Sequence, residues 1–379
     1  MPVTVPDLPP LLDAFYASRA DVAAHADAQR QATGSEPAPD PNRSQRAPRG
    51  SHALGELHAL KGDASTRRYY RFRLAESERH VEPASLVVMQ LPDDGPEGPS
   101  RIQARAFLDV QRFLAAQRIG VPEVYAQDLE HGLLLLEDLG DETFEARLRS
   151  SPQGAWFELY GRATDLLAQL HTVCAPPRDP ADCVAYRKHY DAPLLRWELD
   201  HFREWGLEAL HGALSPSDRS ELDAHFDALT AAIVALPVGF VHRDYQSRNL
   251  MWVGDRLTII DFQDAFLGPA AYDLVALLCD SYVALGPELQ AAMLARYAER
   301  RAFSRDAAAL LVEGFRLISV QRKLKDAGRF VFIDRVRKNP DFLPHYPASL
   351  AYAAAALREL PQFAGLRALL ARLVPGYPG

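Results

Sequence analysis

The chain has 379 residues, of which 48% are hydrophobic and 24% are charged, a composition typical of a globular protein with room for one large domain or two lobes. Its formal net charge of −8 disfavours unspecific nucleic-acid binding, which needs clustered cations, and no uncharged apolar run approaches the roughly 20 residues of a membrane span. The N-terminus lacks the cationic and apolar regions of a signal peptide, and the three cysteines show no metal-ligand spacing. We therefore expect a cytoplasmic protein without a nucleic-acid, membrane or obligatory protein partner.

The first third of the chain predicts a small β-sheet with one main helix. A helical pattern over 10–30 is followed by 31–51, which is rich in Pro, Gly, Ser, Asn and Arg and has no large apolar residue. We interpret 31–51 as a flexible insertion, because such a segment buries too little surface to order itself. Strands and a helix follow, separated by a turn at 61–65 and a loop at 93–100. The strands are expected at 55–60, 68–74, 86–89, 121–125 and 132–136, and the helix at 102–117.

After Glu137 the pattern is mostly helical. Helices are expected at 144–148, 155–171, 193–205, 217–235, 271–285, 287–301, 305–325 and 347–360. A strand-rich segment at 239–262 interrupts them. We therefore expect two lobes, a β-rich lobe of residues 1–137 and a helical lobe of residues 138–379.

The strand-rich segment carries an ordered set of polar residues. Residues 242–249 read H-R-D-Y-Q-S-R-N, and the apolar strand at 257–260 ends in D-F-Q. A hairpin would bring Asp244, Asn249 and Asp261 to one end of a buried sheet. Phosphoryl transfer needs a carboxylate to accept the proton of the attacking hydroxyl, and a carboxylate and an amide oxygen to hold Mg²⁺ against the phosphates. The kinase pattern H-R-D-x-x-x-x-N is complete, with D-F-Q where kinases carry D-F-G.

Each of these residues alone has an ordinary structural interpretation. A lone Asp before a strand is usually a turn or cap residue, and a lone Asn most often closes a loop. Their occurrence together, in order and beside strands, favours a kinase site. We expect His242 to pack behind the loop rather than to act as a catalyst.

Further stretches extend the pattern over nearly the whole chain apart from 31–51. They are 62–71 (GDASTRRYYR), 121–124 (VPEV), 133–140 (LLLLEDLG), 261–265 (DFQDA), 268–269 (GP), 272–275 (YDLV) and 321–325 (QRKLK). Together with 242–251 they resemble the aminoglycoside phosphotransferase and choline kinase group. The resemblance is closer to its branch of bacterial kinases that phosphorylate N-acetylmuramate and N-acetylglucosamine at C1 in peptidoglycan recycling. It implies an α+β, protein-kinase-like two-lobed fold, with a small β-rich N-lobe and a larger helical C-lobe, and an enzyme that uses ATP and Mg²⁺ to phosphorylate a sugar hydroxyl.

The resemblance also makes 1–137 the nucleotide-binding lobe and 138–379 the lobe for catalysis and acceptor binding, and it implies roles for individual positions. It makes Asp244 the catalytic base, Asn249 and Asp261 the magnesium ligands, and Asp273 an acid that supports the catalytic loop. The nucleotide would be held by a phosphate loop and by a hinge that offers backbone groups to adenine. The loop positions are Gly62, Asp63, Ala64 and Ser65, and the hinge runs from Glu137 to Leu139.

One common kinase feature is missing. Kinases place a Lys on the third strand and a Glu on the following helix, whereas here the strand reads V-V-M-Q at 87–90 and the helix at 102–117 has no Glu. The resembled branch also lacks that lysine. Arg68 or Arg71, on the neighbouring strand, could supply the charge to the nucleotide. The alternative for both is a solvated strand arginine.

The acceptor is expected to be a small molecule. Gly268 and Pro269 follow Asp261 so closely that no room remains for the activation loop and A-P-E anchor of a protein kinase. Cations near the end of a predicted helix form either a solvated helix face or a clamp for the lactyl carboxylate of muramate. They are Arg322, Lys323, Lys325 and Arg329, with Arg322 and Lys325 as the expected substrate-binding residues.

Two competing functions stay open. An aminoglycoside- or amino-alcohol-type kinase would need an acidic cleft for its cationic acceptor, which the cations of 321–329 disfavour. A catalytically inactive nucleotide-binding module is favoured by the missing Lys and disfavoured by the intact trio of Asp244, Asn249 and Asp261. Aromatic residues of a helical insertion are either core or lining of the acceptor cleft: Tyr190, Trp197, Phe202 and Trp205.

Overall fold

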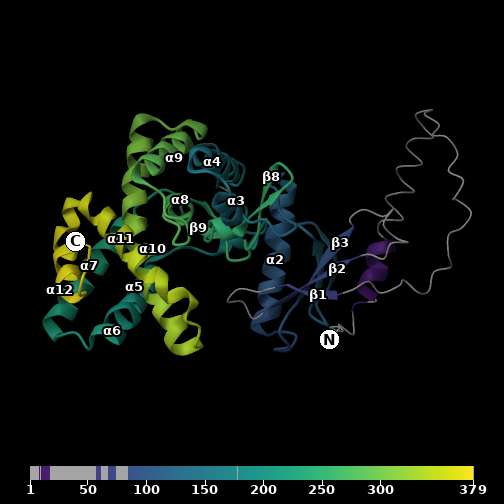
Figure 1. Ribbon diagram of the computed structural model, residues 1–379, viewed down its shortest axis with the longest axis horizontal. Helices are drawn as coiled ribbons and strands as arrows, with labels where there is room; N and C mark the ends of the chain where they lie inside the picture. The colour runs from purple at the N-terminus through teal and green to yellow at the C-terminus, as the bar shows by residue number, and fades with distance from the viewer. Residues whose placement is uncertain are drawn as a thin grey trace, which may run out of the picture. The chain divides into compact units, whose positions relative to one another are not determined.

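The computed structural model describes residues 8, 10–17, 57–60, 67–73, 84–176 and 178–378. The chain divides into two compact units, Met1–Leu108 with Pro122–Leu139, and Asp109–Val121 with Gly140–Gly379. The first holds the expected sheet and the second most of the helices (Figure 1). The expected turn at 61–65 and the expected insertion at 31–51 lie outside the described residues.

The first unit contains a five-stranded antiparallel sheet with strand order β1-β2-β3-β5-β4. The strands are β1 (Leu57–Ala59), β2 (Arg68–Arg73), β3 (Ser85–Gln90), β4 (Val124–Asp128) and β5 (Leu133–Glu137). Helix α2 (Pro99–Ala116) follows β3 and begins three residues earlier than its apolar spacing predicts. All five predicted strands are confirmed among the described residues. The order places β3 in the middle, where Leu86 and Val88 are fully buried.

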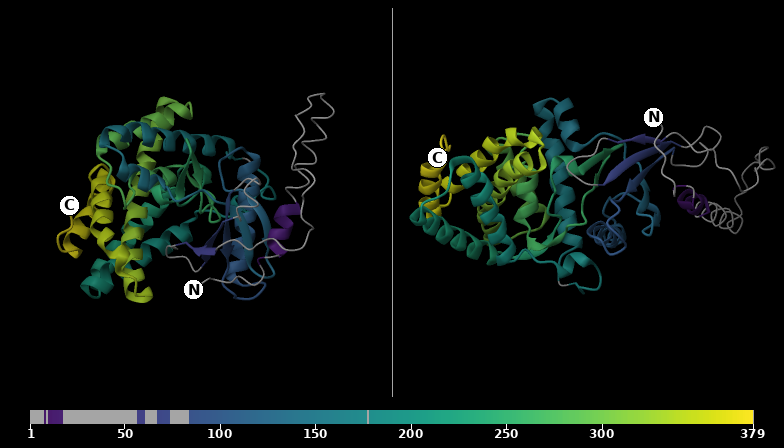
Figure 2. Two further views of the ribbon diagram at one scale, coloured as in Figure 1. Left: turned by 45° about the vertical axis from the view of Figure 1, so that its right-hand side comes forward. Right: turned by 90° about the horizontal axis from the view of Figure 1, so that it is seen from below.

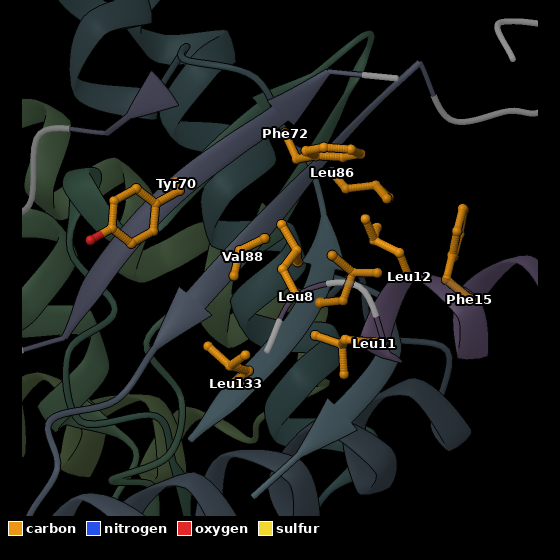
Figure 3. Packing of buried hydrophobic residues seen from close by; sticks show 10 residues of the cluster. Leu8, Leu11, Leu12, Phe15, Tyr70, Phe72, Leu86, Val88 and Leu133 are labelled. Atoms are coloured by element: carbon orange, nitrogen blue, oxygen red, sulfur yellow. The ribbon is translucent and has the colours of Figure 1, made fainter. Parts of the chain in front are cut away.

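A short helix from the start of the chain covers one face of this sheet (Figure 3). Residues 10–17 are helical, which confirms the first part of the predicted helix over 10–30; residues 18–30 lie outside the described part of the chain. Leu8, Leu11, Leu12 and Phe15 pack against the sheet. Their partners in the core are Tyr70, Phe72, Leu86, Val88, Leu133 and Leu135.

The second unit is built around one long helix, α10 (Arg305–Arg337). Helices α5, α8 and α11 pack against it, and Figures 1 and 2 show the C-terminal helices, in yellow, gathered beside it. The other helices are α3 (Phe144–Ser150), α4 (Trp156–Val173), α5 (Ala192–His201), α6 (Ala209–His211), α7 (Pro216–Val234), α8 (Ala271–Leu278), α9 (Pro287–Arg300), α11 (Tyr346–Arg358) and α12 (Ala364–Leu373). Within the described part of the chain, no helix is both long enough and apolar enough to span a membrane.

Two helix ends of the second unit differ most from the sequence-based expectation. The predicted helix over 271–285 is wrong beyond Leu278, because the Asp280 carboxylate accepts the backbone N–H of Tyr282 and turns the chain. The predicted end of α10 at 325 is also wrong, since the helix continues for twelve residues and buries Phe330 and Val331. It ends where Lys338 adopts a left-handed conformation with φ 57°. Helix α12 was not predicted.

Two antiparallel pairs of strands hold the functional loop. Strand β6 (Val238–Val241) pairs with β9 (Phe266–Pro269), and β7 (Leu250–Val253) pairs with β8 (Arg256–Ile259). The segment 242–249 leaves β6 and enters β7, and Asp261 follows β8. The expected hairpin is therefore confirmed, whereas β9 was not predicted.

Helix α5 continues into a π-helix, η4 (Phe202–Glu208), that lies very close to α10. A Cβ atom at Gly328 of α10 would lie 2.7 Å from Phe202 Cα and 3.0 Å from the carbonyl oxygen of His201. These are backbone atoms, which cannot turn away as a flexible side chain could. Gly328 thus permits the close approach of the two helices.

Gly328→Ala is expected to lower the free energy of unfolding by about 1–3 kcal/mol, the usual effect of forcing extra atoms into a packed interior. Urea or guanidinium unfolding at equilibrium measures this. Gly154→Ala is the matched control, because a Cβ there meets nothing within 4 Å. Equal destabilisation by the two substitutions would contradict the packing account.

Candidate active site

The loop after β6 is held by one buried carboxylate. Asp273, on helix α8, is fully buried and accepts the backbone N–H groups of His242 at 2.7 Å and Arg243 at 2.9 Å. His171 of α4 lies 3.0 Å from the same carboxylate through Nε2. These bonds replace the water that a buried carboxylate loses. The geometry is that of the supporting acid expected at this position.

The hydrogen-bond chain behind Asp273 sets the orientation of His171. Arg301 can only donate, so its bond of 2.9 Å makes the Tyr297 hydroxyl oxygen an acceptor. The same hydroxyl lies 2.7 Å from His171 Nδ1, and His171 Nε2 lies 3.0 Å from Asp273, so both ring nitrogens are engaged. Sequence reasoning missed this chain, because its members lie far apart in the sequence.

His242 packs beneath the loop. It is buried, its Nε2 lies 3.0 Å from the Ile260 carbonyl oxygen, and its Nδ1 accepts the backbone N–H of Asp244 at 3.2 Å. Both ring nitrogens are therefore used by the backbone. The arrangement agrees with the structural role expected for His242.

Asp244, Asn249 and Asp261 form one connected group. The Asn249 side-chain amide donates to the Asp244 carbonyl oxygen at 2.9 Å and lies 3.5 Å from Asp261 Oδ2. Gln263 donates to Asp261 Oδ1 at 2.7 Å. The structure thus brings together all three residues that the sequence placed in the catalytic and metal site.

The backbone is strained at two positions in or beside this group. Arg243 has φ 82° and Asp261 has φ 64°, in the left-handed region that residues other than glycine rarely adopt. Such strain is often kept at functional sites, where the surrounding contacts hold it in place. Here the Asp273 bond holds Arg243, and the Gln263 bond reaches the side chain of Asp261.

The Asp244 carboxylate is surrounded by cations. Arg322 of α10 donates to Asp244 Oδ1 at 3.0 Å and to the Arg243 carbonyl oxygen at 2.7 Å. Burial by itself raises the pKa of the Asp244 carboxyl, but the charges of Arg322, Lys325 and Arg243 outweigh this effect and hold the pKa below its ordinary value. The side chain is still 37% exposed. An ionised, accessible carboxylate is the form that accepts a proton.

Arg322, expected as a substrate-binding residue, is bound to the loop that carries Asp244. Its side chain is 3% exposed, and its guanidinium stacks over Tyr272 with 4.7 Å between Cζ and the ring centroid. Both terminal nitrogens are bound to the loop. This geometry favours a role in holding the base over contact with an acceptor. Lys325 is near Asp326, at 3.2 Å, and near the Tyr272 hydroxyl, at 3.4 Å.

A second buried acid also holds the loop. The Asp280 carboxylate accepts the backbone N–H of Ser247 at 3.0 Å and the Ser247 hydroxyl at 2.5 Å. Burial raises the pKa of Asp280. No local pattern indicates this contact, and the segment around Asp280 was predicted to be helical.

The donor set at Asn249 and Asp261 fits a magnesium ion. Mg²⁺ is usually bound by one or two side-chain oxygens together with substrate phosphates and water. Asn249 uses its amide nitrogen for the protein bonds, which leaves its side-chain oxygen, the atom that Mg²⁺ prefers. In the described part of the chain, no group of three or more His, Cys, Asp or Glu side chains could hold a metal by itself. A metal here would thus depend on the nucleotide for further ligands.

The first unit contains the remaining expected nucleotide contacts. Gly62, Asp63, Ala64 and Ser65 lie outside the described residues. Arg68 is exposed at the start of β2, and Glu137 and Leu139 lie at and just after the end of β5. The Glu137 carboxylate accepts the backbone N–H of Glu123 at 3.1 Å.

Arg71 is bound within the first unit. It donates to Asp138 through two bonds of 2.7 and 2.9 Å. Ser85 donates to the same carboxylate at 2.6 Å. The pair joins β2 to the residue directly after β5. Arg68 is therefore more exposed than Arg71, the other arginine considered for phosphate contact.

The four aromatic residues of the helical insertion divide into two groups. Tyr190 and Phe202 are buried in the core. Trp197 is 59% exposed and Trp205 is partly exposed. Trp205 packs edge-on against Phe332 of α10, with 5.2 Å between ring centroids. Only Trp197 and Trp205 of the four can therefore face a ligand.

Comparison with known proteins identifies the family. Residues 56–311 match the model of the phosphotransferase enzyme family. The chain is 33% identical over 326 residues to a Pseudomonas aeruginosa protein named N-acetylmuramate/N-acetylglucosamine kinase, covering 85% of this chain and 89% of that protein. Proteins with the same name from Pseudomonas putida and Caulobacter vibrioides are 32% and 31% identical, covering 86% and 80% of this chain and 91% and 89% of theirs.

Solved structures show the same fold at low sequence identity. A choline kinase from Cryptosporidium parvum superposes with a TM-score of 0.58 at 13% identity, covering 84% of this chain and 94% of that one. An ADP-bound aminoglycoside phosphotransferase gives a TM-score of 0.55 at 14% identity, covering 80% and 95%. The chain therefore belongs to the phosphotransferase enzyme family and has the α+β, protein-kinase-like fold of aminoglycoside phosphotransferases and choline kinases.

Proposed function

We propose that this phosphotransferase is a cytoplasmic kinase that uses ATP and Mg²⁺ to phosphorylate the anomeric hydroxyl of N-acetylmuramate and N-acetylglucosamine in peptidoglycan recycling. The observation that carries the proposal is the connected group of Asp244, Asn249 and Asp261, on a loop that the Asp273 carboxylate holds in place. The names of the relatives at 31–33% identity support the sugar acceptors. The anomeric position and the pathway come from the family resemblance.

In the proposed reaction, Asp244 orients the C1 hydroxyl and accepts its proton. The C1 oxygen attacks the γ-phosphorus of ATP, the bond to the β-phosphate oxygen breaks, and ADP leaves. Asn249 and Asp261 would hold Mg²⁺, which supplies neutralisation of the phosphate charge when it is bound. Arg322 keeps the Asp244 carboxylate in place through the bond to Oδ1 and through the loop carbonyl at Arg243.

The charge around Asp244 supports a neutral or anionic acceptor. Arg243, Arg322 and Lys325 all act on this carboxylate. Because these cations already compensate Asp244, the carboxylate offers a polycationic aminoglycoside or a choline-like amine no uncompensated negative charge. This observation disfavours the amino-alcohol alternative, while the intact trio disfavours an inactive nucleotide-binding module.

The direct test is an assay with ATP of wild-type protein on amino sugars, aminoglycosides, choline and ethanolamine, with the product position determined by phosphorus NMR. We expect turnover of N-acetylmuramate and N-acetylglucosamine with phosphate at C1. Turnover of a cationic acceptor alone would overturn the sugar proposal. ATP binding without turnover of any acceptor would favour the inactive module.

Asp244→Asn is expected to reduce kcat by about 10²–10⁴-fold, the usual effect of losing a general base. ATP binding should stay close to wild type, because Asp244 is assigned to the acceptor rather than to the nucleotide. Steady-state rates and nucleotide titration measure the two effects. A variant with near wild-type kcat would show that another group takes the proton.

Asp261→Ala should weaken magnesium-dependent ATP binding more than Asn249→Ala does, since Asp261 brings a full negative charge to the cation. Titration of Mg²⁺ at fixed ATP compares the two variants with the wild type. An unchanged magnesium requirement in Asp261→Ala would remove Asp261 from the metal site.

Arg322→Ala should lower kcat/KM on both sugars by a similar factor, roughly tenfold to a hundredfold for a lost charge-assisted bond. Both sugars depend on Asp244, which Arg322 holds. Arg322→Lys should recover only part of the rate, because an ammonium group does not reproduce the two-point contact of a guanidinium. Arg316→Ala is the control, being a more exposed arginine of the same helix that pairs with Glu359.

A loss confined to N-acetylmuramate would contradict the assignment of Arg322 to the base. Such a result would support the sequence-based prediction that Arg322 binds the acceptor.

A further inference from the structure

A row of side chains on helix α10 begins at the proposed base. Arg322, Lys325, Arg329 and Phe332 are separated by three, four and three residues, which places them on one face of the helix. Arg322 contacts Asp244 at one end. Arg329 lies two turns further on, about 10 Å along the helix axis. An acceptor whose hydroxyl lies at Asp244 thus has this row of side chains beside it.

Arg329 differs from the two cations nearer the base. Arg322 is bound to Asp244, and Lys325 lies 3.2 Å from the Asp326 carboxylate. Arg329 is partly buried, yet among the residues that the structure describes no carboxylate or hydrogen-bond acceptor reaches its guanidinium. Its described partner is the ring of Phe332, with 5.1 Å between Cζ and the ring centroid. A ring face attracts a cation but carries no net negative charge.

The surroundings of Arg329 add positive charge. Burial and the charges of Arg337 and Arg243 lower the pKa of Arg329. The buried acid Glu198, on the neighbouring helix α5, has another partner, because it accepts the hydroxyl of Tyr190 at 2.7 Å. A partly buried cation among other cations costs free energy unless an anion accompanies it. A negatively charged group of a ligand would supply the missing charge.

We propose that Arg329 binds the lactyl carboxylate of N-acetylmuramate, an inference that rests on the proposed sugar-kinase function. The carboxylate is carried by the lactyl group on O3, two ring carbons from the reacting C1 hydroxyl, so it lies apart from the hydroxyl at Asp244 and within reach of a side chain further along α10. A guanidinium matches a carboxylate with two parallel bonds. Trp205, packed on Phe332, adds an apolar surface beside this position. N-acetylglucosamine has no carboxylate and does not use Arg329.

The test compares Arg329→Ala with wild type on three acceptors: N-acetylmuramate, its methyl ester and N-acetylglucosamine. For N-acetylmuramate we expect kcat/KM to fall roughly tenfold to a hundredfold, mainly through KM. N-acetylglucosamine should be turned over at close to the wild-type rate. The wild type should prefer the acid to the ester, and Arg329→Ala should lose that preference. The ester removes the carboxylate charge and the substitution removes the guanidinium charge, so each change alone abolishes the same ion pair.

Two further variants control for structural damage. Arg329→Lys keeps the charge and should retain part of the preference for the acid. Arg335→Ala removes an exposed cation from the same helix and should leave all three acceptors unaffected. Circular dichroism and the melting temperature confirm folding of each variant.

The outcomes separate this inference from the proposed function. Equal losses on all three acceptors, or an acid preference that survives in Arg329→Ala, would overturn the assignment of Arg329 while leaving the sugar kinase intact. A wild type that phosphorylates none of the three would overturn the function and this inference with it.

Discussion

The buried Asp273 carboxylate is the constraint on which the candidate site depends. It accepts two successive backbone N–H groups of the loop and lies within hydrogen-bond distance of His171. A carboxylate in the interior is tolerated only when such bonds replace its lost hydration. The same bonds hold Arg243 at a positive φ, and this fixes the direction in which the chain presents Asp244. The precision of the base is therefore set from α8, a separate element of the fold.

Charge balance explains how the site can select its acceptor. Arg322 compensates Asp244, and Asp326 compensates Lys325, so these charges are paired before any ligand binds. Arg329 carries a charge for which the described residues supply no counter-ion. Paired charges position groups, whereas an unpaired one in a partly buried place attracts an anion. One helix face would thereby hold the base at one end and recognise the substrate further along.

The sequence predicted the parts of the molecule that local pattern determines. Five strands of the first unit and the trio of Asp244, Asn249 and Asp261 follow from alternation and from motif spacing, and the structure brings the trio together. The end of α8 depends on Asp280, and the position of Arg322 depends on a contact across 78 residues of sequence. Spacing alone cannot distinguish a cation that binds a ligand from one that binds the base. Only the tertiary contacts make that distinction. Spacing alone led us to expect Arg322 at the acceptor, whereas the structure shows it bound to Asp244.

The proposed mechanism requires the anomeric oxygen of the acceptor to lie within hydrogen-bond distance of Asp244. A crystal structure with ADP, Mg²⁺ and N-acetylmuramate bound would measure it. We predict that the C1 oxygen lies within about 2.6–3.2 Å of the Asp244 carboxylate, the reach of a general base. A bound sugar that presents another hydroxyl to Asp244, with C1 out of reach, would contradict the account.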